Sequence, residues 1–376
     1  MVRVLVTGGL GFIGSHTVDM LIDSGYDVTV LDNLERQVHF GKFPNYKNPK
    51  VKYIIGDIRF KKHWLNALED VDTVIHLAGA VGTGQSFWQP RKYLSINTIG
   101  TATLFELLEN NTELKKRITK IIVASSKSIY GEGAYKCEEH GSIFPESRAI
   151  EDLERHKWEP MCPICKNLLH PIPLPESKPI QNPNPYSLGK YTTENLALQY
   201  SKLTGIKTLS LRYFNVYGPR QSLNNPYTGV MAIFLSRMKN GNAPVLYEDG
   251  QQMRDYIYVE DVAKVNVKSI ETGEGVINIG TGVGTSLLSL VEILNKRLGT
   301  NVEPNITSEF RVGDNRHDFA DNKKLKESLH IYNFKKLKDG INNLVEWSEG
   351  IKSVDRFNLA EKERKKYMTR ISNKEI

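Results

Sequence analysis

Cysteine is scarce in this chain of 376 residues, which has only three, at positions 137, 162 and 165. An odd, clustered set of cysteines excludes the disulfide framework of a small secreted domain. The sequence also lacks any apolar run of about 18 residues or more, which excludes a transmembrane helix. A strand-like pattern begins at residue 2 and leaves no room for a signal peptide. We therefore expect a cytoplasmic protein with no membrane partner.

The chain has no stretch in which aromatic and basic residues alternate, although its net charge is +7. Alternation of that kind is typical of surfaces on which nucleic-acid bases stack, so we expect no nucleic-acid partner. Much of the positive charge lies near the end, in "LAEKERKKYMTR", where lysine and arginine are mixed with glutamate. This composition predicts a charged, solvated helical tail over residues 352–376.

Buried strands alternate with helical segments through the first part of the chain, with no internal repeat. Short apolar runs at 2–6, 27–33, 51–57, 72–79 and 120–126 predict strands, and residues 94–111 and 187–205 predict helices. This order predicts an α/β fold, a Rossmann-type doubly wound parallel sheet. We assign 1–215 to a dinucleotide-binding domain and 216–351 to a smaller mixed α/β substrate-binding region, some strands of which can return to the main sheet.

A glycine-rich turn joins the first strand to the first helix. Gly8, Gly11 and Gly14 in "TGGLGFIG" have the spacing with which backbone approaches a pyrophosphate at a helix N-terminus. Asp32 ends the second strand, where a carboxylate can bond both hydroxyls of an adenosine ribose. Its charge would repel a 2′-phosphate, so we expect NAD as cofactor, a preference that Arg36 slightly tempers.

A second motif, "YSLGK", opens the helix at 187–205. Tyr186 and Lys190 are four positions apart and share a helix face, so the ammonium can lie near the phenol. A neighbouring cation favours the phenolate and moves its pKa towards neutrality, as a general base requires. Ser126 follows the fifth strand, at the sheet edge where parallel folds build their sites.

Together these stretches resemble the extended short-chain dehydrogenase/reductase family. "TGGLGFIG", "LDN", "GDI", "HLAG", "SSKSIYG", "YSLGK", "RYFNVYGPR" and "RDYIYVEDVA" occur in that family's order over nearly the whole chain. The resemblance implies a homodimeric enzyme that holds NAD and acts on a nucleotide-diphosphate sugar, with Ser126, Tyr186 and Lys190 catalytic. Implied NAD contacts, besides the glycines, Tyr186 and Lys190, are Phe12, Ile13, Asp32, Asn33, Asp57, Ile58, Leu77, Ala78, Gly79, Asn97 and Phe214. Implied substrate contacts are Ser126, Asn215, Arg254, Arg311 and Asp314.

The residues after Ser126 bear on the reaction. Dehydratases of the family carry an Asp–Glu pair there, whereas this chain has Lys127 and Ser128, which leaves epimerisation through a transient 4-keto sugar. Decarboxylation of a UDP-uronic acid stays open, as does UDP-sugar 4-epimerisation. "AGAVGTGQS" lacks the lysine usual in UDP-galactose 4-epimerases, and the loop before "RDY" is shorter. A non-catalytic binding protein is the third alternative, in which Tyr186→Phe would leave function intact.

An insertion at 131–185 interrupts the α/β pattern and is poor in apolar residues. "YGEGAYKCEEHG" and "WEPMCPICKNLLHPIP" within it resemble the dTDP-L-rhamnose 4-epimerase branch of the family, which implies dTDP-L-rhamnose and dTDP-6-deoxy-L-talose as substrate and product. Cys137 and His140 form a CxxH, and Cys162 and Cys165 form a CxxC. Two such knuckles predict a structural, zinc-ribbon-like Cys₃His zinc site. His156 or His170 could replace His140, and three free thiols are the alternative.

Overall fold

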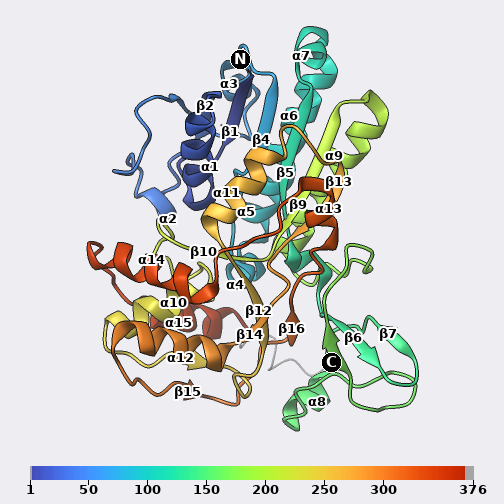
Figure 1. Ribbon diagram of the computed structural model, residues 1–376, viewed down its shortest axis with the longest axis vertical. Coiled ribbons are helices and arrows are strands. Elements are labelled where there is room, and N and C mark those ends of the chain that lie inside the picture. Colours follow the sequence, from blue (N-terminus) through green and yellow to red (C-terminus); the bar gives the residue numbers. More distant parts are fainter. Residues whose placement is uncertain (1, 369–376) are drawn as a thin grey trace.

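The main lobe is built on a parallel sheet of seven strands (Figure 1), in a computed structural model that describes residues 2–368. From one edge to the other they are β3 (Lys52–Ile55), β2 (Asp27–Asp32), β1 (Arg3–Thr7), β4 (Thr73–His76), β5 (Lys120–Ser126), β9 (Lys207–Tyr213) and β13 (Gly275–Ile279). Every neighbouring pair is parallel. The strand order reverses between β1 and β4, and ligands of such sheets bind at this crevice. The predicted fold class is confirmed.

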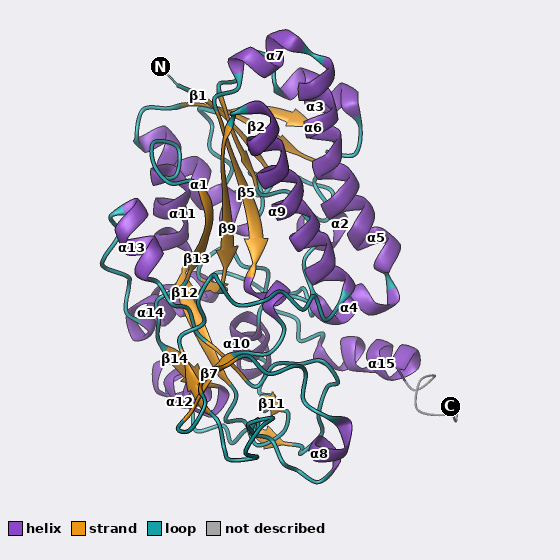
Figure 2. Cartoon of the chain, turned by 90° about the vertical axis from the view of Figure 1, so that its right-hand side faces the viewer, coloured by secondary structure: helices purple, strands orange, loops and turns teal. Residues whose placement is uncertain are grey.

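Helices cover both faces of this sheet (Figure 2). Successive side chains of a strand alternate between the faces, so Val4 and Val6 enter one buried cluster and Leu5 enters the other. The first face is covered by α1 (Phe12–Asp23), α11 (Val259–Lys268) and α13 (Lys323–Leu329). The second face is covered by α3 (Lys61–Ala67), α6 (Gly100–Asn110) and α9 (Pro185–Thr204). Burial on both faces explains why the strands read as nearly continuous apolar runs.

The helix expected at 94–111 is longer and less regular than predicted. It begins as α5 (Pro90–Leu94), passes through a π-helical turn, η1 (Ser95–Ile99), and continues as α6. Such turns often occur at functional sites, and this one contains Asn97. The short helices α2 (Arg36–His39), α4 (Thr83–Trp88) and α7 (Thr112–Arg117) lie in the connections of the same lobe.

A second lobe lies beyond the carboxyl ends of the main strands (Figure 1). Its sheet joins β10 (Asn215–Tyr217), β12 (Met253–Tyr258), β14 (Gly284–Ser286) and β16 (His317–Asp318). Around it lie α10 (Val230–Lys239), α12 (Leu287–Leu298), α14 (Leu337–Glu349) and the pair β11 (Val245–Leu246) and β15 (Asn305–Ile306). Tyr217, Leu290 and Ile341 lie in its buried core. Within 216–351, α11 and β13 instead belong to the main lobe.

The insertion at 131–185 forms a small body against the second lobe (Figure 1). It contains an antiparallel sheet in the order β7 (Gly141–Ile143), β6 (Ala134–Cys137) and β8 (His170–Ile172), together with α8 (Ile150–Glu154). Its buried apolar cluster is small, which fits a segment that needs another source of stability.

The charged tail differs from the solvated segment expected from its composition. Its helix, α15 (Phe357–Met368), lies between the lobes beside α4 (Figure 2). Tyr367 stacks on Trp88 with ring centroids 5.7 Å apart, and Glu363 accepts a hydrogen bond from Tyr227. Residues 369–376 of the predicted tail lie outside the described residues. Within 2–368, no helix is both long and apolar enough to span a membrane.

Candidate active site

The glycine-rich turn packs as closely as a dinucleotide site requires. Gly8 has φ +70°, a conformation that side-chain-bearing residues avoid. A Cβ on Gly14 would lie 2.1 Å from the Gly8 carbonyl oxygen, so α1 can approach the turn only because Gly14 has no side chain. Gly11 caps α1, and Phe12 and Ile13 are the first residues of that helix. This is the bare backbone that a pyrophosphate needs.

Asp32 lies at the end of β2, beside the turn. Its Oδ2 accepts a hydrogen bond from the Leu10 amide at 3.1 Å, and its Oδ1 accepts one from the Leu34 amide at 2.9 Å. The carboxylate is therefore fixed at the end of the strand and keeps capacity to accept further hydrogen bonds. Asn33, next in the chain, is exposed.

Asp57 and Ile58 lie at the end of β3, where the structure holds them in different ways. The guanidinium of Arg59 forms an ion pair with Asp57 at 2.6 Å. Burial opposes ionisation of this carboxyl, but hydrogen bonds from Arg59 and Asn33 outweigh burial and lower the pKa of Asp57. Ile58 is buried in the core against Gly100.

The third side of the crevice is the segment Leu77–Gly79 after β4. The backbone of Ala78 lies so close to Gly8 that a Cβ on Gly8 would be 2.9 Å from the Ala78 backbone. Asn97 holds the following residue, since it accepts from the Ala80 amide at 2.8 Å and donates to the Ala80 carbonyl at 3.1 Å. A Cβ on Gly79 would lie 3.0 Å from the Asn97 side-chain oxygen. The segment thus reaches the turn without side chains in the way.

Below this crevice lies a polar network that the sequence analysis did not identify. His76 Nδ1 is 2.7 Å from the hydroxyl of Thr7, and its Nε2 is 3.1 Å from the hydroxyl of Thr101. Burial, with a smaller contribution from the Lys190 cation, lowers the pKa of His76 to about 3, so the ring is neutral. Thr101 also contacts Thr193 of α9 at 3.1 Å. The network joins β1, β4, α6 and α9 beneath the site.

Ser126, Tyr186 and Lys190 converge at the carboxyl end of β5. Ser126 is the last residue of that strand, before the 3₁₀ turn η2 (Lys127–Tyr130). Tyr186 lies in the first turn of α9, which a capping box between Asn184 and Ser187 starts. Tyr186 lies close enough to Ser126 for that side chain to oppose the rise in the pKa of the phenol, and Lys190 donates to the Ala124 carbonyl at 2.9 Å. The structure therefore brings together the three residues predicted to be catalytic.

Burial dominates the electrostatics of this trio. It raises the pKa of Tyr186, and only the Ser126 side chain opposes that shift. It also lowers the pKa of Lys190 to about 8, with no carboxylate contributing. Tyr93 contacts the Tyr186 ring edge to face at 6.3 Å and is a further lining residue that the sequence did not indicate. A phenol in this setting needs additional positive charge before it can act as a base near neutral pH.

A buried charge cluster adjoins the trio on the side of the second lobe. Lys127, directly after Ser126, forms an ion pair with Asp318 at 2.6 Å. Arg254 lies on the other side of Asp318 at 3.4 Å, and Asp314 pairs with Arg254 at 3.6 Å. Burial opposes ionisation of Asp318, but the cations of Lys127 and Arg254 lower its pKa. The Oδ1 atom of Asp318 is buried without a partner.

The other predicted substrate contacts lie around this cluster. Asn215 donates to the Asp255 carbonyl at 3.2 Å, and Phe214 is buried beside β13. Arg311 lies 4.0 Å above the Tyr247 ring and pairs with Glu361 of α15 at 3.5 Å. The C-terminal helix therefore contacts a predicted substrate residue, a relation that no sequence signal indicated.

The Cys/His cluster lies apart from this crevice, in the insertion. The donor atoms of Cys137, His140, Cys162 and Cys165 all lie within 4.8 Å of one another. His156 instead stacks on Trp158 at 5.1 Å, and His170 lies on β8. The structure therefore brings together Cys137, His140, Cys162 and Cys165, and it leaves the two alternative histidines outside the cluster.

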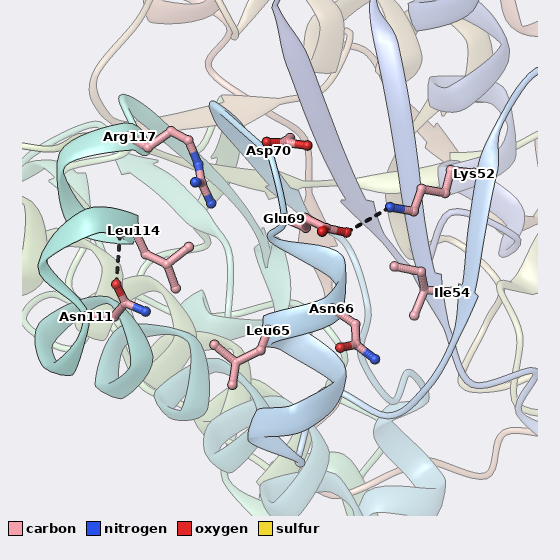
Figure 3. A pocket seen from close by; sticks show the side chains of 9 residues that line it. All are labelled: Lys52, Ile54, Leu65, Asn66, Glu69, Asp70, Asn111, Leu114 and Arg117. Atoms are coloured by element: carbon pink, nitrogen blue, oxygen red, sulfur yellow. Dashed lines mark hydrogen bonds and ion pairs between the residues drawn. The ribbon is translucent and has the colours of Figure 1, made fainter.

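A separate surface cavity lies away from this crevice. It measures about 550 Å³ and lies between α3 and α7, near the amino ends of the main strands (Figure 3). Lys52, Glu69, Asn111 and Arg117 are among the polar groups around it, and its lining includes none of the predicted site residues. Lys52 and Glu69 in its lining pair with each other at 3.3 Å, so these charges need no ligand to balance them.

The fold and the crevice define the class of protein, a dinucleotide-binding enzyme with a serine–tyrosine–lysine centre. The sequence profile described as GDP-mannose 4,6 dehydratase matches residues 5–148, and that of the NAD dependent epimerase/dehydratase family matches 169–280. A Methanocaldococcus jannaschii protein named "Putative UDP-glucose 4-epimerase" is 35% identical, covering 92% of this chain and 97% of that protein. The chain therefore belongs to the extended, NAD-dependent epimerase/dehydratase family and is an isomerase of its epimerase branch.

Two further relatives are informative about the branch. The dTDP-L-rhamnose 4-epimerase of Burkholderia thailandensis is 31% identical, covering 92% of this chain and 94% of that protein. The crystal structure of the Thermotoga maritima UDP-glucose 4-epimerase with UDP-glucose gives a TM-score of 0.76 at 31% identity, covering 92% and 98% of the two chains. Both are named for reactions at C4 of a nucleotide sugar.

Proposed function

We propose that this chain is an NAD-dependent 4-epimerase of a nucleotide-diphosphate sugar, with dTDP-L-rhamnose and dTDP-6-deoxy-L-talose as its substrate pair. The observation that carries the reaction type is the Ser126–Tyr186–Lys190 centre followed by Lys127. Lys127 is buried against Asp318 and cannot act as the carboxylic acid that dehydration needs. The carboxyl of Asp318 lies nearby, but the cations of Lys127 and Arg254 lower its pKa and hold it ionised, so it is no proton donor. A centre that removes and returns a proton and a hydride then performs epimerisation.

The residues fit NAD. Gly8 and Gly14 leave bare backbone where a side chain would clash, and Asp32 is fixed beside them to accept the ribose hydroxyls. When bound, NAD supplies the acceptor and donor of the hydride at the sugar C4. Its positive nicotinamide would supply the charge that Tyr186 lacks in this structure, and we assign Lys190 to its ribose.

Tyr186 is the base in this proposal. Its phenolate takes the proton of the C4 hydroxyl, with Ser126 holding that hydroxyl, and returns a proton to C4–O⁻ when the hydride arrives on the opposite face. Between these steps the 4-keto sugar turns while the diphosphate stays anchored. We assign the anchor to Asn215 and Arg254, with Arg311 and Asp314 at its rim. In this division of labour, residues 1–215 hold NAD and the lobe from 216–351 holds the sugar nucleotide.

The rhamnose assignment is supported by the Burkholderia thailandensis relative, which is 31% identical over 92% of the chain, and by the insertion motifs around Cys137 and Cys162. A UDP-hexose 4-epimerase is the second candidate, because the relative at 35% identity is named for UDP-glucose. The missing lysine in "AGAVGTGQS" counts against that candidate.

The deciding experiment is incubation of the purified protein with dTDP-L-rhamnose, followed by proton NMR of the C4 configuration. Formation of a mixture with the 6-deoxy-L-talose epimer supports the proposal. Tyr186→Phe should reduce kcat by about 10²–10⁴-fold with NAD still bound, since only proton transfer is lost. Turnover of UDP-glucose, but not of the rhamnose nucleotide, would replace the sugar assignment and keep the reaction type.

A homodimer and a cytoplasmic location complete the proposal. Leu104, Leu107 and Leu108 of α6 are buried in the chain's own core. Apolar groups left exposed on the preceding turn η1 and on α9 include Ile99, at 54%, and Leu188, at 44%. We assign the dimer face to them, and sedimentation equilibrium would find a mass near that of one chain if this is wrong. None of the three cysteines forms a disulfide, which suits a reducing compartment.

A further inference from the structure

The four residues of the Cys/His cluster come from two turns of the insertion. Cys137 ends β6, and His140 precedes β7 on the other side of a tight turn. Cys162 and Cys165 flank a second turn, whose two ends are held by the isolated bridge between Met161 and Leu168. Both cysteines nearest the core, Cys137 and Cys162, are at most 1% exposed.

Three of the six separations between the donor atoms match those of a tetrahedral zinc site, and all six are within 4.8 Å. Cys137 Sγ lies 3.5 Å from His140 Nδ1 and 3.6 Å from Cys165 Sγ, and Cys162 Sγ lies 3.7 Å from the same His140 nitrogen. Bonds of about 2.3 Å to sulfur and about 2.1 Å to nitrogen, arranged as a tetrahedron, give separations of roughly 3.5–3.8 Å between ligands. Disulfide sulfurs lie about 2.05 Å apart, so this arrangement is not a disulfide.

The backbone of the second turn is shaped like a metal knuckle. Lys166 has φ +62°, and its amide donates to the Cys162 carbonyl at 3.0 Å. The Cys162 amide donates to the Asn167 carbonyl at 2.8 Å, and the Asn167 side chain bonds Glu139 at 2.7 Å. The hydrogen bond between Asn167 and Glu139 ties the two turns to each other outside the cluster.

The apolar surroundings are too small to hold these turns. The buried cluster here consists of Tyr135, Leu169 and two of the cysteines, with Ile143 and Cys165 at its edge. Small bodies with so little core are usually stabilised by a metal or by disulfides. All three cysteines of the chain are free and are used in this one cluster.

The second turn continues directly into contacts with the substrate lobe. Glu159, three residues before Cys162, pairs with Arg316 at 2.6 Å and with His317 at 2.9 Å. Arg316 is 1% exposed and also pairs with Asp249 at 2.7 Å. Asp318, two residues after Arg316 in the chain, pairs with the cations beside the catalytic trio. The ion pair between Glu159 and Arg316 therefore connects the cluster to the segment that lines the crevice.

We propose that Cys137, His140, Cys162 and Cys165 bind one structural zinc ion, which fixes Glu159 against Arg316 and so positions the Asp318 segment of the substrate pocket. All four coordination positions are filled by protein, so the ion has no open site for substrate or water. Glu159 is a positioning residue in this arrangement. The metal assignment does not depend on which sugar the enzyme uses.

The first test is the metal content of full-length protein purified without chelators. Elemental analysis should find one zinc per chain, and thiol modification should release it. Cobalt substitution should give visible bands and a sulfur-to-cobalt charge-transfer band typical of tetrahedral thiolate ligation. His140→Cys should keep the metal and strengthen the charge-transfer band, whereas His170→Ala, the matched control, should leave the spectrum unchanged. Folded protein without zinc, and without cobalt after reconstitution, would overturn the proposal.

The second test separates the metal from the link to the pocket. Glu159→Gln should keep one zinc per chain and the same NAD content. It should raise KM for the nucleotide sugar roughly tenfold, the effect of one lost charge-assisted hydrogen bond, with kcat nearly unchanged. An equal KM would refute the positioning role, whatever the metal content. If the protein turns over no sugar tested, retained metal with unchanged cobalt bands still decides the site.

Discussion

Replacing Lys190 by methionine should make the NAD-free protein more stable while destroying its activity. Lys190 is 5% exposed, and its one hydrogen bond is to the Ala124 carbonyl. Burial lowers its pKa from 10.5 to about 8. Below that pKa the folded protein carries a buried cation that the unfolded chain leaves in water. The side chain is therefore present for chemistry and at the expense of folding.

The shift sets the magnitude. The lowering of the Lys190 pKa from 10.5 to about 8 corresponds to a penalty of about 3 kcal/mol at pH 7. Methionine has a similar shape and no charge, but it leaves the Ala124 carbonyl without this donor, which costs about 1–2 kcal/mol. Lys190→Met should therefore raise the free energy of unfolding by about 1–2 kcal/mol at pH 7.

The pH dependence provides the sharper test. Because the folded pKa is lowered, the unfolded chain binds more protons between pH 8 and 10.5, and the wild type gains stability as pH rises through this window. At pH 9.5 the penalty falls to about 1.4 kcal/mol, so the advantage of Lys190→Met should shrink by about 2 kcal/mol. Taking the difference between the two proteins cancels the titration of all other groups.

The assay is guanidinium unfolding of NAD-stripped wild type and variant at pH 7 and pH 9.5. Lys202→Met is the matched control, because Lys202 lies on the same helix α9 and is exposed. We expect that control to change stability by no more than about 0.5 kcal/mol at either pH. A Lys190→Met protein less stable than wild type at pH 7, or an advantage equal at both pH values, would refute the argument.

Two further substitutions test the crevice. Gly14→Ala places a Cβ 2.1 Å from a backbone oxygen of the turn, so thermal unfolding should show a loss of about 1–3 kcal/mol, and NAD retained after gel filtration should fall. In the control Gly84→Ala, the added Cβ lies 3.9 Å from its nearest neighbour, so stability and NAD retention should be unchanged. Equal losses in the two variants would contradict the packing argument. Asp318→Asn leaves two buried cations uncompensated and should cost about 3–5 kcal/mol, whereas Asp314→Asn, 41% exposed, should cost less than about 1 kcal/mol in denaturant titration.

Local sequence patterns predicted those parts of the site that are made by short stretches of chain. The glycine turn, Ser126 at a strand end and the Tyr186–Lys190 pair each occupy one strand–turn–helix unit, so their geometry follows from the unit itself. The sheet could be predicted for the same reason, because each strand is buried on both faces and reads as an apolar run.

Features that depend on distant segments could not be predicted in this way. The partner of Lys127 is 191 residues away along the chain, and no pattern around either residue indicates the pair. No pattern in the sequence shows that the guanidinium of Arg254 donates to the carbonyls of Met253, Asn315 and Arg316, which hold the side chain in place. The composition of the last helix indicated a solvated segment. Composition alone cannot distinguish charged residues that pair across an interface from charged residues that face water.

The position of the insertion explains why a metal there should affect substrate binding more than proton transfer. The insertion leaves the fold after Ser126 and returns just before Tyr186, so its two ends carry the catalytic pair. Those ends are joined independently of the Cys/His cluster, because the amides of Gln181 and Asn182 both donate to the Ile129 carbonyl, at 3.1 and 3.0 Å. Loss of the metal would therefore loosen the far side of the insertion, which contacts the substrate lobe, while the serine and tyrosine stay in register. A metal-free enzyme with an impaired kcat and an unchanged KM would contradict this reasoning.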